Sequence, residues 1–280
     1  MNNNHTSFPA AQDSKTLWQH RSVSRRQICG VQQASVVVSL YNYADCILDT
    51  LNRVKDQTYA NLELLIVDDA SSDAGCDLVL AWIQEHYLRF TSTTLLRHQR
   101  NSGLAAARNT GFAHVHNPWV WVQDADNHLA PWALQQAMQI AARVEKRVAV
   151  IHPLLLCEPA TAARTVFQGG GQPWQRSAFL RANCVDAMAL VRHEAWQSVN
   201  GYTHIDGGWE DYDFWCKLIE NGWHGLQIPQ VAGSYFVHES SMTATTALPH
   251  ARKLEACLQE RHPWLDCLGA TSRYFTSGGG

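Results

Sequence analysis

The chain has 280 residues, of which 46% are hydrophobic and 17% charged, and its formal net charge is -3. This balance fits a globular protein with one large α/β domain or two small ones, and it excludes a general electrostatic attraction to nucleic acid. The eight cysteines include no C-x-x-C pair, so they predict neither a zinc knuckle nor a disulfide framework, and we expect a reducing, cytoplasmic location. No signal peptide or transmembrane run is predicted, which leaves peripheral membrane association open.

Strands and helices are predicted to alternate from Ala34 onward, after a polar segment (residues 1–32) without sustained periodicity. Apolar and β-branched runs predict strands at 34–40, 62–67, 94–97, 120–122, 148–151, 187–191 and 233–238. Helical spacing of apolar residues predicts helices at 44–56, 74–87, 131–143, 194–199, 210–220 and 249–262, and a small-residue helix after the loop that begins at Arg100. This alternation favours right-handed βαβ units and a parallel sheet.

Acidic residues follow two of the predicted strands directly. Asp68 and Asp69 come after one strand, and Asp124 and Asp126 come after the run that ends at Val122. Open α/β sheets bind ligands at the carboxyl ends of their strands, and two carboxylates so close together suit a hard divalent cation. An isolated D-x-D is, however, most often a turn, so this motif alone leaves both interpretations open.

A second acidic stretch, Gly207-Gly-Trp-Glu-Asp-Tyr-Asp-Phe-Trp215, is predicted to open the helix that ends near Glu220. It places Glu210 and Asp211 in the first turn, where the helix dipole favours negative charge, so ordinary capping competes with a catalytic role. Before it, residues 160–176 contain three consecutive glycines, and a loop of this length is expected to act as a lid or an acceptor-site loop.

Five features in this order closely resemble the family 2 glycosyltransferases of the GT-A fold, over about residues 35–238. They are a strand ending in Tyr41-Asn42, VDDASSD from Val67, NSGLAAARNTG from Asn101, the D-x-D, and GGWEDYDFW. The resemblance implies a Rossmann-like three-layer α/β/α sandwich with a mostly parallel central sheet. It places the domain at residues 33–245, with a nucleotide-sugar half (33–127) and an acceptor half (128–245), between an N-terminal extension (1–32) and a C-terminal helix and flexible tail (246–280).

The resemblance also implies an activity and residue roles. The activity is metal-dependent inverting transfer of a hexosyl or N-acetylhexosaminyl group from a nucleotide-sugar, expected to be a UDP-sugar, to a hydroxyl of a saccharide or related acceptor. Asp211, beside Glu210, matches the catalytic base, and Asp124 and Asp126 match the pair that holds Mn²⁺ or Mg²⁺. Arg108 matches a residue near the diphosphate. The implied donor-binding residues are Ser39, Tyr41, Asn42, Asp68, Asp69, Arg108, Asp124 and Ala125.

Some positions carry two interpretations or depart from the family pattern. His238 matches a further metal or diphosphate contact but suits the core equally well, and Trp209, beside Gly208, is either an acceptor platform or packing under the helix. Ser39-Leu40 replaces the usual Pro, Asn127 replaces a common Asp after the D-x-D, and Gln123 precedes it where an apolar residue is usual. None of these changes removes a proposed ligand, so we expect activity, although they weaken any inference about donor preference.

Three other classes are weighed against this interpretation. A non-catalytic nucleotide-sugar or glycan-binding module derived from a transferase is the alternative, although retention of both acidic motifs speaks against it. A nucleotidyltransferase would carry a Gly-rich phosphate loop near Leu40, and a dehydrogenase would carry G-x-G-x-x-G after the first strand; the sequence has neither.

Overall fold

The structure, a computed structural model, describes residues 16–24, 30–159, 165–169, 174–237, 243–247 and 249–268. Its centre is a ten-stranded sheet in the order β1-β4-β3-β2-β5-β9-β7-β10-β6, with β8 paired to β7. The strands are β1 (Thr16–Val23), β2 (Ala34–Leu40), β3 (Leu62–Asp68), β4 (Ser92–His98), β5 (Trp119–Asp124), β6 (His128–Leu129), β7 (Val148–Pro159), β8 (Thr165–Gly169), β9 (Leu190–Arg192) and β10 (His224–Val237).

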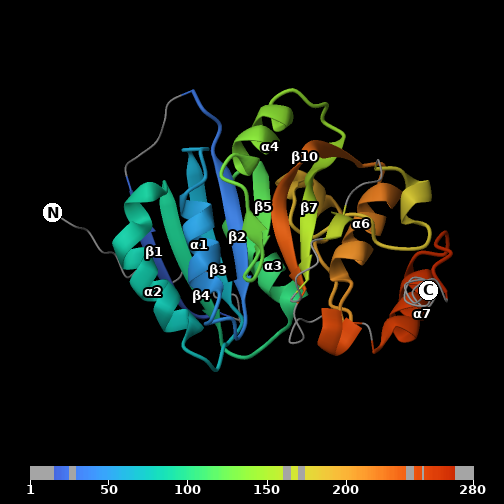
Figure 1. Cartoon of the computed structure of the whole chain (residues 1–280), viewed down its shortest axis with the longest axis horizontal. Coiled ribbons are helices and arrows are strands. Elements are labelled where there is room, and N and C mark those ends of the chain that lie inside the picture. Colours follow the sequence, from blue (N-terminus) through green and yellow to red (C-terminus); the bar gives the residue numbers. More distant parts are fainter. Residues whose placement is uncertain are drawn as a thin grey trace.

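Helices cover both faces of the sheet, because the central strands are apolar on both sides. On β2, Val36 and Val38 pack into one core and Val37 into the other, and all three are fully buried. One face carries α1 (Ile47–Lys55), α2 (Gly75–His86) and α4 (Ala133–Ala141); the other carries α3 (Leu104–His114), α5 (His193–Ser198), α6 (Glu210–Glu220) and α7 (Ala251–Arg261). Figure 1 shows α1 and α2 beside β1–β4 and α6 and α7 at the opposite end.

The predicted three-layer α/β/α class is confirmed. β2, β3, β4 and β5 are parallel neighbours, and β7 and β10 form a second parallel pair. Three short helical turns complete the described elements: η1 (Tyr87–Arg89), η2 (Arg176–Phe179) and the π-helical η3 (Thr243–Ala247). Within the described ranges, no helix is long and apolar enough to cross a membrane.

The structure differs from the predicted elements mainly in its antiparallel strands. β1 lies in the segment expected as an extension, and it pairs antiparallel with β4 at one edge of the sheet. β9 runs antiparallel between β5 and β7. β10 begins nine residues earlier than predicted, at His224 rather than residue 233, because shifts in its pairing with β7 between Gln227 and Gly233 interrupt the regular alternation of the strand.

Helix α3 packs very closely against β2, as its run of small residues predicted. Ala105 and Ala107 are buried, and Gly111 lies so close to the sheet that an added Cβ would overlap Cγ1 of Val37. Because α3 carries Arg108, this close approach sets the depth at which that guanidinium enters the site.

Replacing Gly111 with Ala is expected to destabilise the protein, because the overlap with Val37 outweighs the gain in helix propensity. We expect a loss of about 1–3 kcal/mol in the free energy of unfolding, measured by urea titration. Gly75→Ala is the matched control, since the nearest atom to a Cβ there, Asp73 Oδ1, would be 3.0 Å away, farther than Val37 Cγ1 would be at position 111. A Gly111→Ala protein as stable as the parent would contradict the close packing.

Helix α7 is attached to α6 by a buried polar cluster around Asp213. Asp213 accepts hydrogen bonds from Arg261 Nε at 2.5 Å and His262 Nε2 at 3.0 Å, and Lys217 Nζ lies 3.6 Å away. Burial alone would raise the pKa of Asp213, but the bonds from His262 and Arg261 outweigh it and lower the pKa to about 2. His262 also bonds Glu220 through Nδ1 at 2.8 Å. The cluster therefore holds its carboxylate charged.

A depressed carboxyl pKa adds stability that is present above the unfolded-state pKa of 3.8 and is lost as pH falls toward about 2. Asp213→Asn is expected to lower the free energy of unfolding by about 2 kcal/mol at pH 6, with a smaller difference at pH 4. Urea titrations at the two pH values measure this. Asp266→Asn removes an exposed ion pair with Arg181 and should cost less than about 1 kcal/mol. A pH-independent loss would contradict the charged cluster.

Candidate active site

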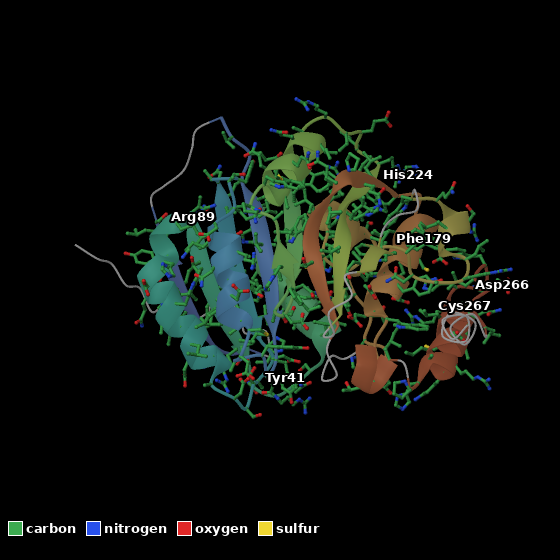
Figure 2. All side chains as sticks on the ribbon, in the orientation of Figure 1. Tyr41, Arg89, Phe179, His224, Asp266 and Cys267 are labelled. Carbon is green, nitrogen blue, oxygen red and sulfur yellow. The ribbon has the colours of Figure 1, made fainter. Side chains whose placement is uncertain are left out.

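The motifs that follow the predicted strands at 34–40, 62–67 and 120–122 meet at one edge of the sheet. The parallel register pairs Ser39 with Asp124, and Leu40 with Asp68. Figure 2 places Tyr41 at this edge and His224, the first residue of β10, at the opposite one. The carboxyl ends of β2, β3 and β5 therefore form one surface, as expected for a ligand site on a parallel sheet.

The turns after β2 and β3 are joined to each other. Asn42 has a left-handed backbone (φ 58°), its Oδ1 accepts from the Ser72 amide at 2.8 Å, and its own amide donates to Ser71 Oγ at 3.0 Å. The Ala44 amide donates to Asp73 Oδ2 at 2.8 Å. Tyr41 precedes this junction and is 43% exposed. The two turns, which are hydrogen-bonded to each other, thus support the exposed aromatic ring of Tyr41.

The side chains of Asp68 and Asp69 are buried and bound to protein groups. Asp68 accepts from the Ser71 amide at 3.1 Å and pairs with Arg97 Nε at 3.3 Å. Asp69 binds His98 Nδ1 at 2.6 Å and accepts from the amides of Ser102 and Gly103, the latter at 2.7 Å. These bonds brace the turn after β3 and the loop that leads into α3. Direct contact of either carboxylate with a nucleotide stays a prediction.

Arg108 connects the D-x-D to the first turn of α6. Its Nη2 donates to Asp124 Oδ1 and its Nη1 to Glu210 Oε1, both at 2.8 Å, and its side chain is only 2% exposed. The guanidinium also lies 5.5 Å from the ring centroid of Tyr202. Burial by itself would lower the pKa of Arg108, but the charges of Asp124 and Glu210 outweigh it and raise the pKa. Residues distant in sequence are thereby fixed at one point.

The two carboxylates of the D-x-D are held in different ways. Asp124 Oδ2 lies 3.4 Å from Asn127 Nδ2, and Asn127 is in turn fixed by the Phe236 amide at 3.0 Å. Ala125 is buried, and its carbonyl accepts from a threonine hydroxyl of α1 at 2.7 Å. Burial, together with the charge and a hydrogen bond of Asp126, raises the pKa of Tyr43. The buried alanine therefore anchors the motif between two partly exposed acids.

The acids form a donor set of oxygen atoms only, which fits Mn²⁺ or Mg²⁺ better than a soft metal. Within the described ranges, no three His, Cys, Asp or Glu side chains are grouped as a metal site. His238, the predicted third contact, lies outside the described residues. Two carboxylates alone leave most coordination positions to oxygens of a ligand or water.

The segment before α6 has an unusual backbone. Gly207, Gly208 and Trp209 all have positive φ angles, of 106°, 110° and 64°, and α6 starts immediately afterwards at Glu210. Trp209 is partly buried, and its ring meets that of Tyr212 edge-on at 6.3 Å. Because of this sharp turn, the loop ends and the helix begins directly at the acidic pair, Glu210 and Asp211.

Asp211 is held by two neutral donors. The Tyr212 amide donates to its Oδ1 at 2.8 Å, and Asn183 Nδ2 donates to its Oδ2 at 2.7 Å. Burial and then the charge of Glu210 raise the pKa of Asp211 well above its ordinary value of 3.8, although Arg108 acts in the opposite direction. A partly buried carboxylate with a raised pKa, whose printed partners among the described residues are two amides, is suited to accept a proton.

Sequence reasoning missed two side chains of this site, Asn183 and Asp186. The antiparallel register of β9 on β5, continued by the Val122 amide bond to the Ala189 carbonyl at 2.9 Å, brings Asp186 alongside the D-x-D. Its Oδ1 accepts from the Met188 amide at 2.8 Å, and its pKa is raised by burial and then by the charge of Asp124. The apolar run at 187–191 predicted a strand just after these residues, but no sequence signal showed its antiparallel pairing with β5, on which their placement depends.

Comparison with known proteins shows similarity to glycosyltransferases. Residues 35–157 match the sequence model of "Glycosyl transferase family 2". An uncharacterized glycosyltransferase of Haemophilus influenzae is 26% identical over 190 residues, which cover 66% of this chain and 62% of that protein. The chain thus spans less than two thirds of that relative's length.

Two solved structures share the fold. S. aureus TarS 1-349 in complex with UDP-GlcNAc superposes with a TM-score of 0.64 at 16% identity, over 82% of this chain and 66% of that one. The mannosyltransferase PcManGT from Pyrobaculum calidifontis, in complex with GDP-Man and Mn²⁺, has a TM-score of 0.62 at 20% identity, over 81% and 63%. The chain therefore has the GT-A fold of these two structures, and its residues 35–157 are similar to glycosyl transferase family 2.

Proposed function

We propose that this protein is a metal-dependent inverting glycosyltransferase. It transfers a hexosyl or N-acetylhexosaminyl group from a nucleotide-sugar, a UDP-sugar by preference, to a hydroxyl of a saccharide or related acceptor. The observation that carries the proposal is the Arg108 bridge, which joins Asp124 of the D-x-D to Glu210, the neighbour of Asp211. The two relatives solved with UDP-GlcNAc and with GDP-Man and Mn²⁺ support a nucleotide-sugar donor and a divalent ion.

The donor is proposed to lie along the ends of β2, β3 and β5. The exposed ring of Tyr41 is placed to stack on the base, and Asn42 holds the turn beneath it. Ser39 Oγ is buried and has no hydrogen-bond partner among the described residues, so a ligand hydroxyl would satisfy it. Ala125, the small buried residue between the two acids, is proposed to let the donor approach the backbone closely.

Asp124 and Asp126 are the residues that would hold Mn²⁺ or Mg²⁺, with His238 as a proposed further contact. When bound, the ion supplies positive charge to the diphosphate leaving group. Arg108 keeps Asp124 in place, and both of its terminal nitrogens already bind carboxylates, so any contact with the diphosphate would be shared with them.

Asp211 is the proposed base. In a single displacement, the acceptor oxygen attacks the anomeric carbon, the bond from that carbon to the diphosphate oxygen breaks, and the acceptor proton passes to Asp211. Glu210 is occupied by Arg108, so its role is to fix the start of α6. The raised pKa makes Asp211 a stronger base than an exposed aspartate. Trp209 and Gly208 are proposed to border the acceptor.

Donor binding is expected to require a divalent ion. In a thermal-shift screen of UDP-, GDP- and dTDP-sugars, we expect stabilisation by a UDP-sugar only when Mn²⁺ is present. Asp126→Asn and Asp124→Ala should each weaken donor affinity by more than the roughly 10-fold typical of an outer-shell change. Asp266→Asn serves as control, because Asp266 is 71% exposed and lies in a surface ion pair. Unchanged donor and metal affinity in Asp124→Ala would refute the assignment of the D-x-D.

Asp211→Asn is expected to lower kcat by roughly 10²–10⁴-fold while leaving the donor Kd within about twofold of the parent. Because the folded-state pKa of Asp211 is raised, the base-competent form accumulates as pH rises, and kcat/KM should increase between pH 5 and pH 8. Rates of sugar transfer across this range measure both effects. Full transfer by Asp211→Asn would instead favour a different base, whereas donor binding by the parent with neither transfer nor metal-dependent donor hydrolysis would favour a non-catalytic module.

A further inference from the structure

The segment between η2 and β9 is attached to α6 on both sides of Asn183. Tyr212 Oη donates to the Phe179 carbonyl, and Trp215 Nε1 donates to the Val185 carbonyl at 3.0 Å. Tyr212, Trp215 and Phe179 are fully or almost fully buried, so neither anchor bond competes with water. Asn183 therefore lies on a short span whose two ends are fixed to the helix that carries Asp211.

Asn183 uses both ends of its amide group. Its Oδ1 accepts from the Val185 amide at 3.2 Å, which closes a local turn and leaves Nδ2 directed at Asp211 Oδ2, 2.7 Å away. With the Tyr212 amide on Oδ1, each oxygen of Asp211 receives one fixed donor. Two donors on two oxygens set the plane of the carboxylate and leave the remaining lone pairs for a substrate proton.

The neutral character of these donors matters for a base. A bound guanidinium or ammonium would hold the carboxylate charged but lower its basicity, whereas an amide orients it with a smaller effect. The nearby Arg108 is instead committed to Asp124 and Glu210. The charged and titratable groups that face Asp211 are Glu210 and Cys216 of α6, Arg108 of α3, Asp124 of β5, Tyr202, and Asp186 before β9.

We propose that Asn183 is a positioning residue for the base: its side-chain amide orients Asp211 toward the acceptor hydroxyl and favours the ionised carboxylate. This role rests on the proposed function, because it acts through Asp211. Loss of the donor leaves the partly buried carboxylate with one hydrogen bond fewer, so its ionisation then requires a higher pH.

The test is the pH profile of kcat/KM for Asn183→Ser. The serine hydroxyl can still accept from the Val185 amide, but it is too short to reach Asp211, and it introduces no charge. We expect a loss of about 10-fold or more near pH 6, a smaller loss near pH 9, and a donor Kd within about twofold of the parent. Asn183→Asp adds a carboxylate that faces Asp211, so it should move the acid limb of the profile to a still higher pH.

Asn221→Asp is the matched control, because Asn221 lies at the exposed far end of α6 and its partners among the described residues are Lys217 and Arg147. It should leave the profile unchanged. If kcat/KM of Asn183→Ser falls by the same factor at every pH, so that the acid limb stays where it is in the parent, the positioning role is overturned. Thermal unfolding establishes that the variants are folded. If Asp211→Asn itself keeps transfer, the base assignment fails; if it abolishes transfer while Asn183→Ser keeps the parental limb, only the role of Asn183 fails.

Discussion

The site depends on one buried cation. Arg108 is almost fully enclosed, and a guanidinium in that position is tolerated only if carboxylates neutralise it. Asp124 lies 16 residues away in the sequence and Glu210 lies 102 residues away. Because Arg108 on α3 binds both carboxylates, β5 and α6 meet at the same edge of the sheet. Their meeting brings the proposed cation ligands and the proposed base together.

This bridge also divides the acids by role. Glu210 and Asp124 both bind the guanidinium of Arg108, whereas the donors to Asp211 among the described residues are amides. The next residue along the helix, Asp211, has a raised pKa because of burial and the charge of Glu210. Adjacent carboxylates of the same helix turn thus have different partners, a guanidinium for Glu210 and two amides for Asp211.

Much of this arrangement could be predicted from local patterns. β2 begins and ends where its β-branched run predicted, and α6 begins at Glu210 because the glycines before it stop any earlier helix. The positions of Asn183 and Asp186 could not be predicted. They depend on β9 pairing antiparallel with β5, and periodicity shows that a strand exists without showing its partner. β1 was missed altogether, because its segment has no sustained periodicity and nothing local in it indicates pairing with β4.

The start of α6 is fixed from three directions. Arg108 holds Glu210, Asn183 holds Asp211, and the cluster of Arg261 and His262 holds Asp213. The preceding loop is bound at its start, where the side chain of Asn109 bonds Tyr202 and those of Lys217 and Arg261 bond Thr203. Further along, the positive-φ backbone of Gly207 lies against Leu254 of α7. The proposed acceptor border, Gly208 and Trp209, thus follows a fixed stretch of loop and precedes the helix that holds the proposed base, so its side chain can change with little effect on the geometry of proton removal.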